Sequence, residues 1–151
     1  MAMATGTHFK ELARRRLKTA KILLDNEDWQ AAAYMMGLAL ECALKSSICK
    51  TLRITDYPED HKDKKVPDFF MTHSFIRLLL VSGLNDIFDV KGVALAFDNW
   101  SAFTARFPGD WTAMRYIDDR QFDAATTRSL FGNIYLDEHS IFKVISKKRR
   151  W

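Results

Sequence analysis

The sequence predicts an all-α protein, a mostly up-and-down bundle of four or five helices. Apolar residues recur at steps of three and four along most of the chain, which is the spacing of one face of a helix. No segment alternates between apolar and polar residues as a half-buried strand does. The chain has 151 residues, of which 48% are hydrophobic, and only 6 glycines and 3 prolines, so it fits a single helical core.

The first half predicts two long helices. Residues 8–26 carry one apolar stripe with basic residues on the other faces, which indicates an amphipathic helix. After a polar break, residues 29–52 carry apolar residues on opposite sides, so this second helix is expected at the centre of the bundle. Its two cysteines, Cys42 and Cys49, lie about 10 Å apart along the helix axis, too far for a disulfide, and are expected to be reduced core thiols.

The second half predicts a long loop and three further helices. Residues 54–72 are polar and hold two prolines, which is typical of a loop. Thr72 or Ser74 is expected to cap a short helix that ends at Gly83. Two long helices are expected after that, separated by an interruption at residues 110–120. The third long helix starts at about Asn85, and its stripe is Val93, Phe97 or Ala96, Trp100, Phe103 and Phe107, before Pro108 and Gly109. The last long helix carries Phe122, Ala125, Leu130, Phe131, Ile134, Ile141 and Ile145.

The charge distribution divides the chain into a single domain, residues 7–147, and a basic C-terminal tail, residues 148–151. The net charge of +4 equals the four basic residues 147–150, and the rest of the chain is formally neutral. A second basic cluster lies on the first helix at Lys10, Arg14, Arg15, Arg16, Lys18 and Lys21. Such clusters are either solvated faces or contacts for a phosphate backbone.

The start of the chain does not resemble a secretory signal, and no apolar run reaches the roughly 20 residues of a membrane span. A cytoplasmic protein without membrane contact is therefore expected.

Two charges stand inside the apolar central helix. Glu41 and Lys45 are one turn apart in the favourable order, but a surface pair of this kind contributes only about 0.2–0.5 kcal/mol. That is too little to offset the several kcal/mol of hydration that each buried ion loses. Either a groove lets both charges reach water, or further groups compensate for their burial.

Three segments in order resemble the HEPN family, the "higher eukaryotes and prokaryotes nucleotide-binding" domain. The longest is ARRRLKTAKILLDNEDWQAAAYMMGLALECALKSSI, whose A-x-E-x-x-x-K core is Ala39, Glu41 and Lys45. MTHSFIRLLLVSGL resembles the family's helix of His and Leu, and WTAMRY resembles its Trp-to-Arg-Tyr segment. The resemblance spans about residues 8–145 and implies a HEPN-like helical bundle.

The resemblance implies several functional properties. HEPN domains commonly form homodimers, and many prokaryotic members are encoded beside a minimal nucleotidyltransferase as a toxin and antitoxin. Others are metal-independent ribonucleases that use an Arg and a His four to six residues apart. This chain departs from that pattern, since the residues at those spacings after Arg115 are Arg120, Gln121 and Phe122. A divergent catalytic pair would instead combine Arg115 with His73.

No cofactor and no metal are predicted. His8, His61 and His139 have no nearby cysteines or carboxylates at the spacing of a zinc site. The sequence has no phosphate-binding glycine loop and no motif of a nucleophilic enzyme.

Three functional hypotheses follow. The first is a non-catalytic HEPN-like module, part of a toxin–antitoxin or defence system, that binds a nucleotide, RNA or a nucleotidyltransferase partner. Its groove is expected to be lined by Glu41, Lys45, His73, Arg115 and Tyr116. The second is a divergent metal-independent ribonuclease toxin that uses Arg115 and His73. The third is a non-enzymatic structural or oligomerisation partner.

Overall fold

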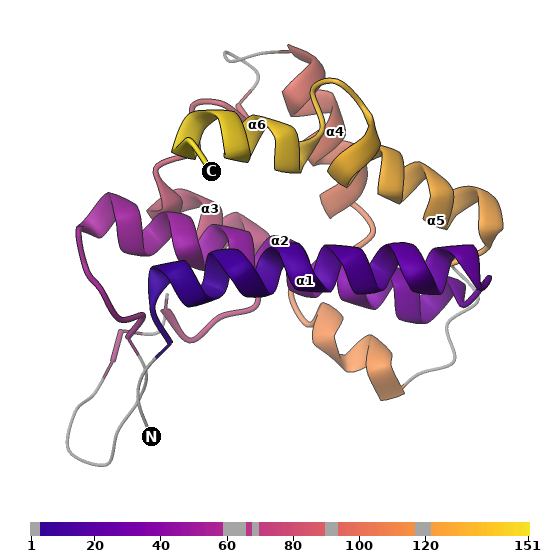
Figure 1. Ribbon diagram of the computed structural model, residues 1–151, viewed down its shortest axis with the longest axis horizontal. Helices are drawn as coiled ribbons and strands as arrows, with labels where there is room; N and C mark the ends of the chain where they lie inside the picture. Colours follow the sequence, from indigo (N-terminus) through magenta and orange to yellow (C-terminus); the bar gives the residue numbers. More distant parts are fainter. Residues whose placement is uncertain (1–3, 59–65, 68–69, 90–93, 117–121) are drawn as a thin grey trace.

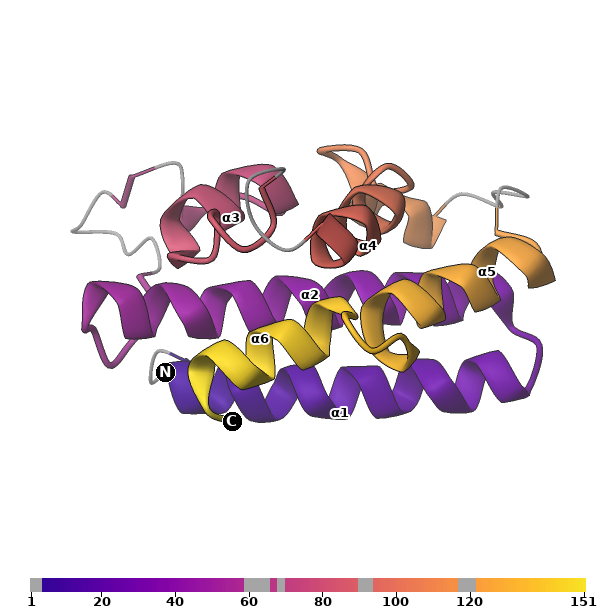
Figure 2. The ribbon, with the colours of Figure 1, turned by 90° about the horizontal axis from the view of Figure 1, so that it is seen from above.

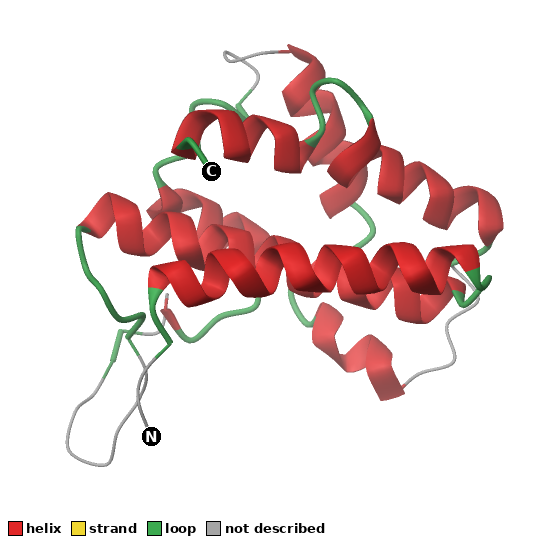
Figure 3. Cartoon of the chain, viewed as in Figure 1, coloured by secondary structure: helices red, strands yellow, loops and turns green. Residues whose placement is uncertain are grey.

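The computed structural model describes residues 4–58, 66–67, 70–89, 94–116 and 122–151. The predicted all-α class is confirmed, since these residues form helices and no strand (Figures 1 and 3). The order is α1 (Gly6–Asp25), α2 (Trp29–Leu52), α3 (Phe75–Ser82), α4 (Ala94–Thr104), the 3₁₀-helix η2 (Trp111–Tyr116), α5 (Ala124–Phe131), the π-helix η3 (Gly132–Leu136) and α6 (Ile141–Arg149).

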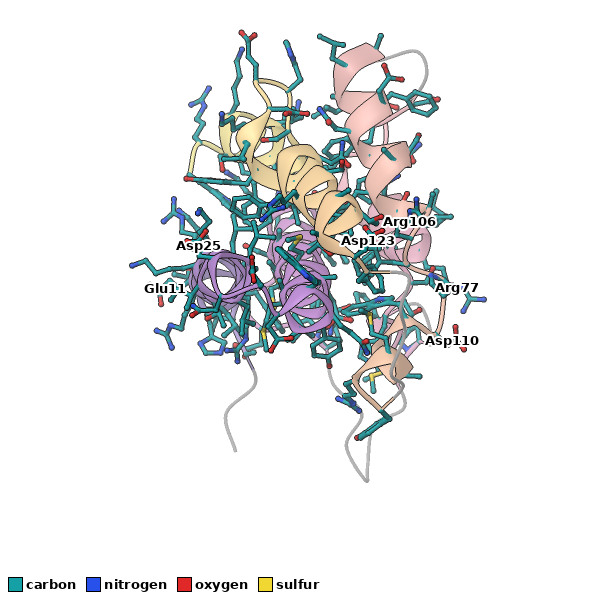
Figure 4. The ribbon with its side chains drawn as sticks, turned by 90° about the vertical axis from the view of Figure 1, so that its right-hand side faces the viewer. Glu11, Asp25, Arg77, Arg106, Asp110 and Asp123 are labelled. Atoms are coloured by element: carbon teal, nitrogen blue, oxygen red, sulfur yellow. The ribbon has the colours of Figure 1, made fainter. Side chains whose placement is uncertain are left out.

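Helix α2 lies between the other elements of the bundle. It packs antiparallel to α1 on one side and contacts α3 and η2 on the other, while α5 and α6 cross above the α1–α2 pair (Figure 2). Its buried residues lie on all faces, which agrees with the two apolar stripes in the sequence. Figure 4 looks along α1 and α2 and shows Glu11 and Asp25 on the outer side of α1, away from this core.

The expected boundaries of the first three helices are close to the observed ones. The second predicted helix, 29–52, coincides with α2. Ser74, rather than Thr72, caps α3, because its hydroxyl accepts a hydrogen bond from the Arg77 backbone N–H. Gly83 ends α3 in the left-handed conformation, with φ of 76°, as a glycine after a helix commonly does.

The expected third long helix is wrong in its extent. Residues 85–89 form turns, and α4 covers only Ala94–Thr104, so Phe107 follows the helix. Phe107 is nevertheless buried, as its place in the apolar stripe predicted, and its ring stacks on Phe103 at 4.7 Å. Val93 of that stripe, and residues 59–65 and 68–69 of the predicted loop, lie outside the described residues.

The expected last long helix is also wrong, since it is broken in two. After α5 the backbone widens into η3 and then turns at residues 137–139 before Ser140 precedes α6. The polar run Asp137-Glu138-His139 is the physical reason for the break. In a continuous helix these three consecutive side chains would point to different faces, so at least one polar side chain would face the core. The break lets α5 and α6 lie at different angles over α1 and α2 (Figure 1).

The basic C-terminus is part of the bundle. Helix α6 extends through Lys148 and Arg149, beyond the residue 147 boundary expected for the domain. The Arg149 guanidinium donates hydrogen bonds to the Ser47 hydroxyl at 3.3 Å, the Thr51 hydroxyl at 2.8 Å and the Ser82 carbonyl. These bonds join α6 to α2 and α3.

None of the helices in the described ranges is both long and apolar enough to cross a membrane.

Candidate functional site

The acid in the middle of α2 meets a histidine that precedes α3. An oxygen of the Glu41 carboxylate contacts Nδ1 of His73. The Glu41 side chain is 8% exposed, whereas the His73 side chain is 52% exposed, so the imidazole links a buried acid to solvent. Because an ionised carboxylate only accepts hydrogen bonds, Nδ1 carries the proton, and Nε2 of the neutral ring is left as a base.

Lys45 is the second partner of the buried acid. Its Nζ lies 3.9 Å from Oε2 of Glu41, and its side chain is 16% exposed. The ammonium also lies over two aromatic rings, 5.6 Å from the centroid of Phe9 and 5.1 Å from that of Tyr57. The interpretation that both charges reach water through a groove does not hold for Glu41, since its side chain is only 8% exposed. The Lys45 ammonium and the His73 imidazole compensate for the burial of the acid, and two ring faces compensate for that of the ammonium.

Tyr57 is held in place by backbone pairing and by its own hydroxyl. Its N–H donates to the Ala4 carbonyl at 2.8 Å, and its hydroxyl donates to the Phe70 carbonyl at 2.8 Å. Burial, and then the charge of Glu41, raise the pKa of the Tyr57 phenol. The ring beneath Lys45 is therefore a neutral, fixed aromatic face.

Trp111 connects the histidine with η2. Its indole N–H donates to the His73 carbonyl at 2.7 Å, and its ring stacks on Phe75 at 5.2 Å. Gly37 of α2 allows this approach, because a Cβ at that position would lie 2.7 Å from a carbon of the indole ring. The ring also packs on Tyr34 at 5.6 Å.

Arg115 and Tyr116 form an exposed pair at the end of η2. The Arg115 guanidinium donates to the Tyr34 hydroxyl at 3.3 Å and lies 4.8 Å from the centroid of the Tyr116 ring. The hydrogen bond to Tyr34 raises the pKa of the arginine. Tyr116 is 80% exposed, and the pair borders an open cavity of about 550 Å³. The lining residues are Asp28, Gln30, Ala31, Tyr34, Met114, Arg115 and Tyr116.

The five residues expected in one groove form two groups. Glu41, Lys45 and His73 touch one another, and Arg115 touches Tyr116. In the described part of the chain no hydrogen bond or ion pair joins Arg115 to the first group. Trp111 links the groups, since it contacts His73 at one end and the Tyr34 partner of Arg115 at the other.

Sequence reasoning did not identify the residues that support these two groups. Tyr34 stands seven residues before Glu41, which places both on one face of α2 about 10 Å apart, so helical spacing could have found it. Trp111 belongs to the WTAMRY segment that resembles the HEPN family, but its hydrogen bond to His73 has no sequence signal. The same holds for Phe9 and Tyr57, because their contacts with Lys45 depend on the folded chain.

The arrangement offers a base, a cation and an exposed aromatic ring. The His73 imidazole can act as a base through Nε2, the Arg115 guanidinium can hold a phosphate, and the Tyr116 ring can stack on a nucleobase. Among the described residues, no three His, Cys, Asp or Glu side chains gather as a metal site requires.

Comparison with known proteins gives no match: no family model fits the chain, and no curated protein or solved structure is significantly similar to it. The HEPN resemblance rests on the sequence motifs alone.

Proposed function

We propose that the chain is a HEPN-like module that binds a nucleotide or a short single strand of RNA on the face of α2 shared with η2. The observation that carries the proposal is the Arg115 guanidinium lying over the exposed Tyr116 ring, on an element whose Trp111 also contacts His73. A guanidinium binds phosphate oxygens in pairs, and an exposed aromatic ring stacks on any base. Together they fit a ligand with a phosphate beside an unpaired base.

The spacing between the two groups favours more than one nucleotide. The Tyr34 partner of Arg115 lies about 10 Å along α2 from Glu41, and bases of one stacked strand rise about 3.4 Å each. A strand of about three nucleotides held at Arg115 would therefore reach the His73 imidazole.

The family-level properties are part of the same proposal. A homodimer, a minimal nucleotidyltransferase partner and a toxin–antitoxin role follow from the HEPN resemblance. They predict that the chain co-purifies with the product of a neighbouring nucleotidyltransferase gene.

The binding proposal is tested by fluorescence anisotropy with a labelled six-nucleotide single-stranded RNA. Arg115→Ala and Tyr116→Ala are expected to weaken binding about tenfold each, as is typical of losing one phosphate or stacking contact. Both side chains are exposed, so their loss leaves the fold intact. Arg106→Ala removes an exposed arginine near Asp123 (Figure 4) and serves as the charge-matched control. Equal affinity in the wild type and all three variants would exclude this face as the site.

The Glu41 and His73 contact supports a second candidate, a metal-independent ribonuclease. A carboxylate that fixes the protonated Nδ1 leaves Nε2 to take the proton of a ribose 2′-hydroxyl, whose oxygen then bonds to the adjacent phosphorus as the P–O5′ bond breaks. The departing 5′-oxygen takes a proton from water and leaves as a hydroxyl, and a 2′,3′-cyclic phosphate remains. The Arg115 cation, whose Tyr34 partner stands about 10 Å along α2 from Glu41, would hold another phosphate of the same strand and so keep the reacting nucleotide at His73. This reading predicts RNA cleavage in chelator that is lost in His73→Ala and in Arg115→Ala. RNA that stays intact at high protein concentration would leave only the binding function.

A further inference from the structure

A groove on the opposite side of α2 from η2 has an apolar floor and a basic rim. It runs between α1 and the C-terminal elements α5, η3 and α6, which cross above α1 in Figures 1 and 2. Its volume is about 610 Å³. Its lining residues are Arg14, Leu17, Lys18, Lys21, Phe131, Tyr135, Leu136, Phe142, Lys143 and Ser146.

The floor is apolar and partly uncovered. Leu17, Phe131 and Phe142 belong to the core and form its base. Tyr135 and Leu136 are 45% and 56% exposed, although both are large apolar side chains that border the groove. They stand on the π-helix η3, a rare backbone form that is frequent at functional sites. An apolar ligand body on this floor would remove their exposed surface from water.

The rim presents cations at one place rather than evenly. Lys21 pairs with Asp25 at 2.5 Å, and Lys143 donates to the Leu136 carbonyl at 3.0 Å. Arg14 and Lys18 have no acidic partner within the described ranges. They stand one turn apart on α1, where like charges repel.

The Arg14 guanidinium is positioned by the C-terminal residue. It lies 5.8 Å from the centroid of the Trp151 ring, which holds it at the groove without using its hydrogen-bond donors. An anion between Arg14 and Lys18 would relieve their repulsion and accept hydrogen bonds from both.

We propose that this groove binds a single-chain anionic amphiphile, with its carboxylate between Arg14 and Lys18 and its hydrocarbon chain on the floor of Leu17, Phe131 and Phe142. The volume lies within the range of about 300–1,000 Å³ that is typical of small-molecule pockets. One unpaired cationic pair matches one headgroup, whereas an acidic helix or a nucleic acid would need cations along the whole groove. The site shares no lining residue with the face proposed for RNA.

The proposal is tested by calorimetric titration of the full chain with laurate below its micelle concentration. Laurate is expected to bind, with about fourfold weaker binding for each methylene group removed from the chain. Dodecyltrimethylammonium, with an equally long chain and the opposite charge, is expected not to bind.

Three variants localise the ligand. Arg14→Ala/Lys18→Ala is expected to weaken laurate binding at least tenfold, whereas Arg15→Ala/Lys148→Ala, with the same change in net charge at two exposed positions, leaves it unchanged. Leu136→Ser, at an exposed position that the fold tolerates, weakens binding without a change in charge. Absent laurate binding, or equal affinity for the two double variants, overturns the proposal. So does binding of an amphipathic Leu and Glu peptide in place of laurate, because the groove would then be a protein-docking surface.

Discussion

Replacing Glu41 by Gln tests whether the buried acid holds the bundle together. The change keeps the size of the side chain and removes its negative charge. In the native protein that charge faces the His73 ring and the Lys45 ammonium, whose Nζ is 3.9 Å away. The variant leaves Lys45, with a side chain only 16% exposed, without an acid.

The expected loss of stability depends on the contacts that Lys45 and His73 keep in the variant. Removing one partner of a buried ion pair typically costs about 3–5 kcal/mol. The ammonium keeps its contacts with two ring faces, which contribute about 0.5–2 kcal/mol, and the half-exposed histidine can turn to water. We therefore expect Glu41→Gln to lower the free energy of unfolding by about 2–4 kcal/mol, a large part of the 5–15 kcal/mol of a typical domain.

Urea denaturation followed by tryptophan fluorescence measures this loss. The chain offers a matched control in Asp25→Asn, because Lys21 and Asp25 form a pair with the same spacing on α1 but with side chains 49% and 59% exposed. That variant is expected to lose less than about 1 kcal/mol. Glu41→Gln/Lys45→Met should recover part of the loss, since it removes the uncompensated cation. If Glu41→Gln costs no more than Asp25→Asn, the burial argument fails.

Three other predictions concern single positions. Gly37→Ala is expected to lower the unfolding free energy by about 1–3 kcal/mol through overlap with an indole ring, whereas Gly109→Ala, with nothing within 4 Å of its new methyl group, is neutral in the same urea assay. Burial and a neighbouring carboxylate raise the pKa of the Cys42 thiol from 9.0 to about 11, so the folded state keeps this proton longer than the unfolded state. The free energy of unfolding is therefore expected to fall by about 2–3 kcal/mol as the pH rises from 9.0 to about 11. In the urea assay, Cys42→Ala should abolish this part of the pH dependence. Arg149→Ala removes donors to three acceptors on two other helices and should lower the thermal midpoint, at a cost of about 1–3 kcal/mol, while the exposed Lys148→Ala leaves it unchanged.

Helices whose ends are set by nearby residues in the sequence could be predicted from it. The apolar stripes gave α2 its boundaries, and Ser74 and Gly83 marked the two ends of α3 through a cap and a left-handed residue. Where an apolar spacing continued across a polar break, as at residues 137–140, periodicity joined two helices that the structure separates. At this break the polar residues, and not the apolar spacing, determine where the helix ends.

The candidate site was predictable as a set of residue types but not as a set of contacts. Glu41 could be predicted as a site residue because a charge in an apolar helix requires a partner. Its partner His73 stands 32 residues away in sequence, and helical periodicity does not predict their contact. The hydrogen bond from Trp111 to the His73 carbonyl spans 38 residues and likewise comes only from tertiary packing.

The two groups of the proposed RNA-binding face contribute differently to the fold. Effects of a substitution on binding can therefore be distinguished from its effects on stability. Arg115 and Tyr116 are exposed, so their replacement changes a ligand contact and little else. Glu41 is buried, so its replacement destabilises the bundle and also frees the His73 ring from one orientation. A ribonuclease would therefore lose activity in Glu41→Gln even under conditions where the variant is fully folded, because Nδ1 would no longer be fixed as the protonated nitrogen. A module that only binds RNA through Arg115 and Tyr116 would keep its affinity in the same folded variant.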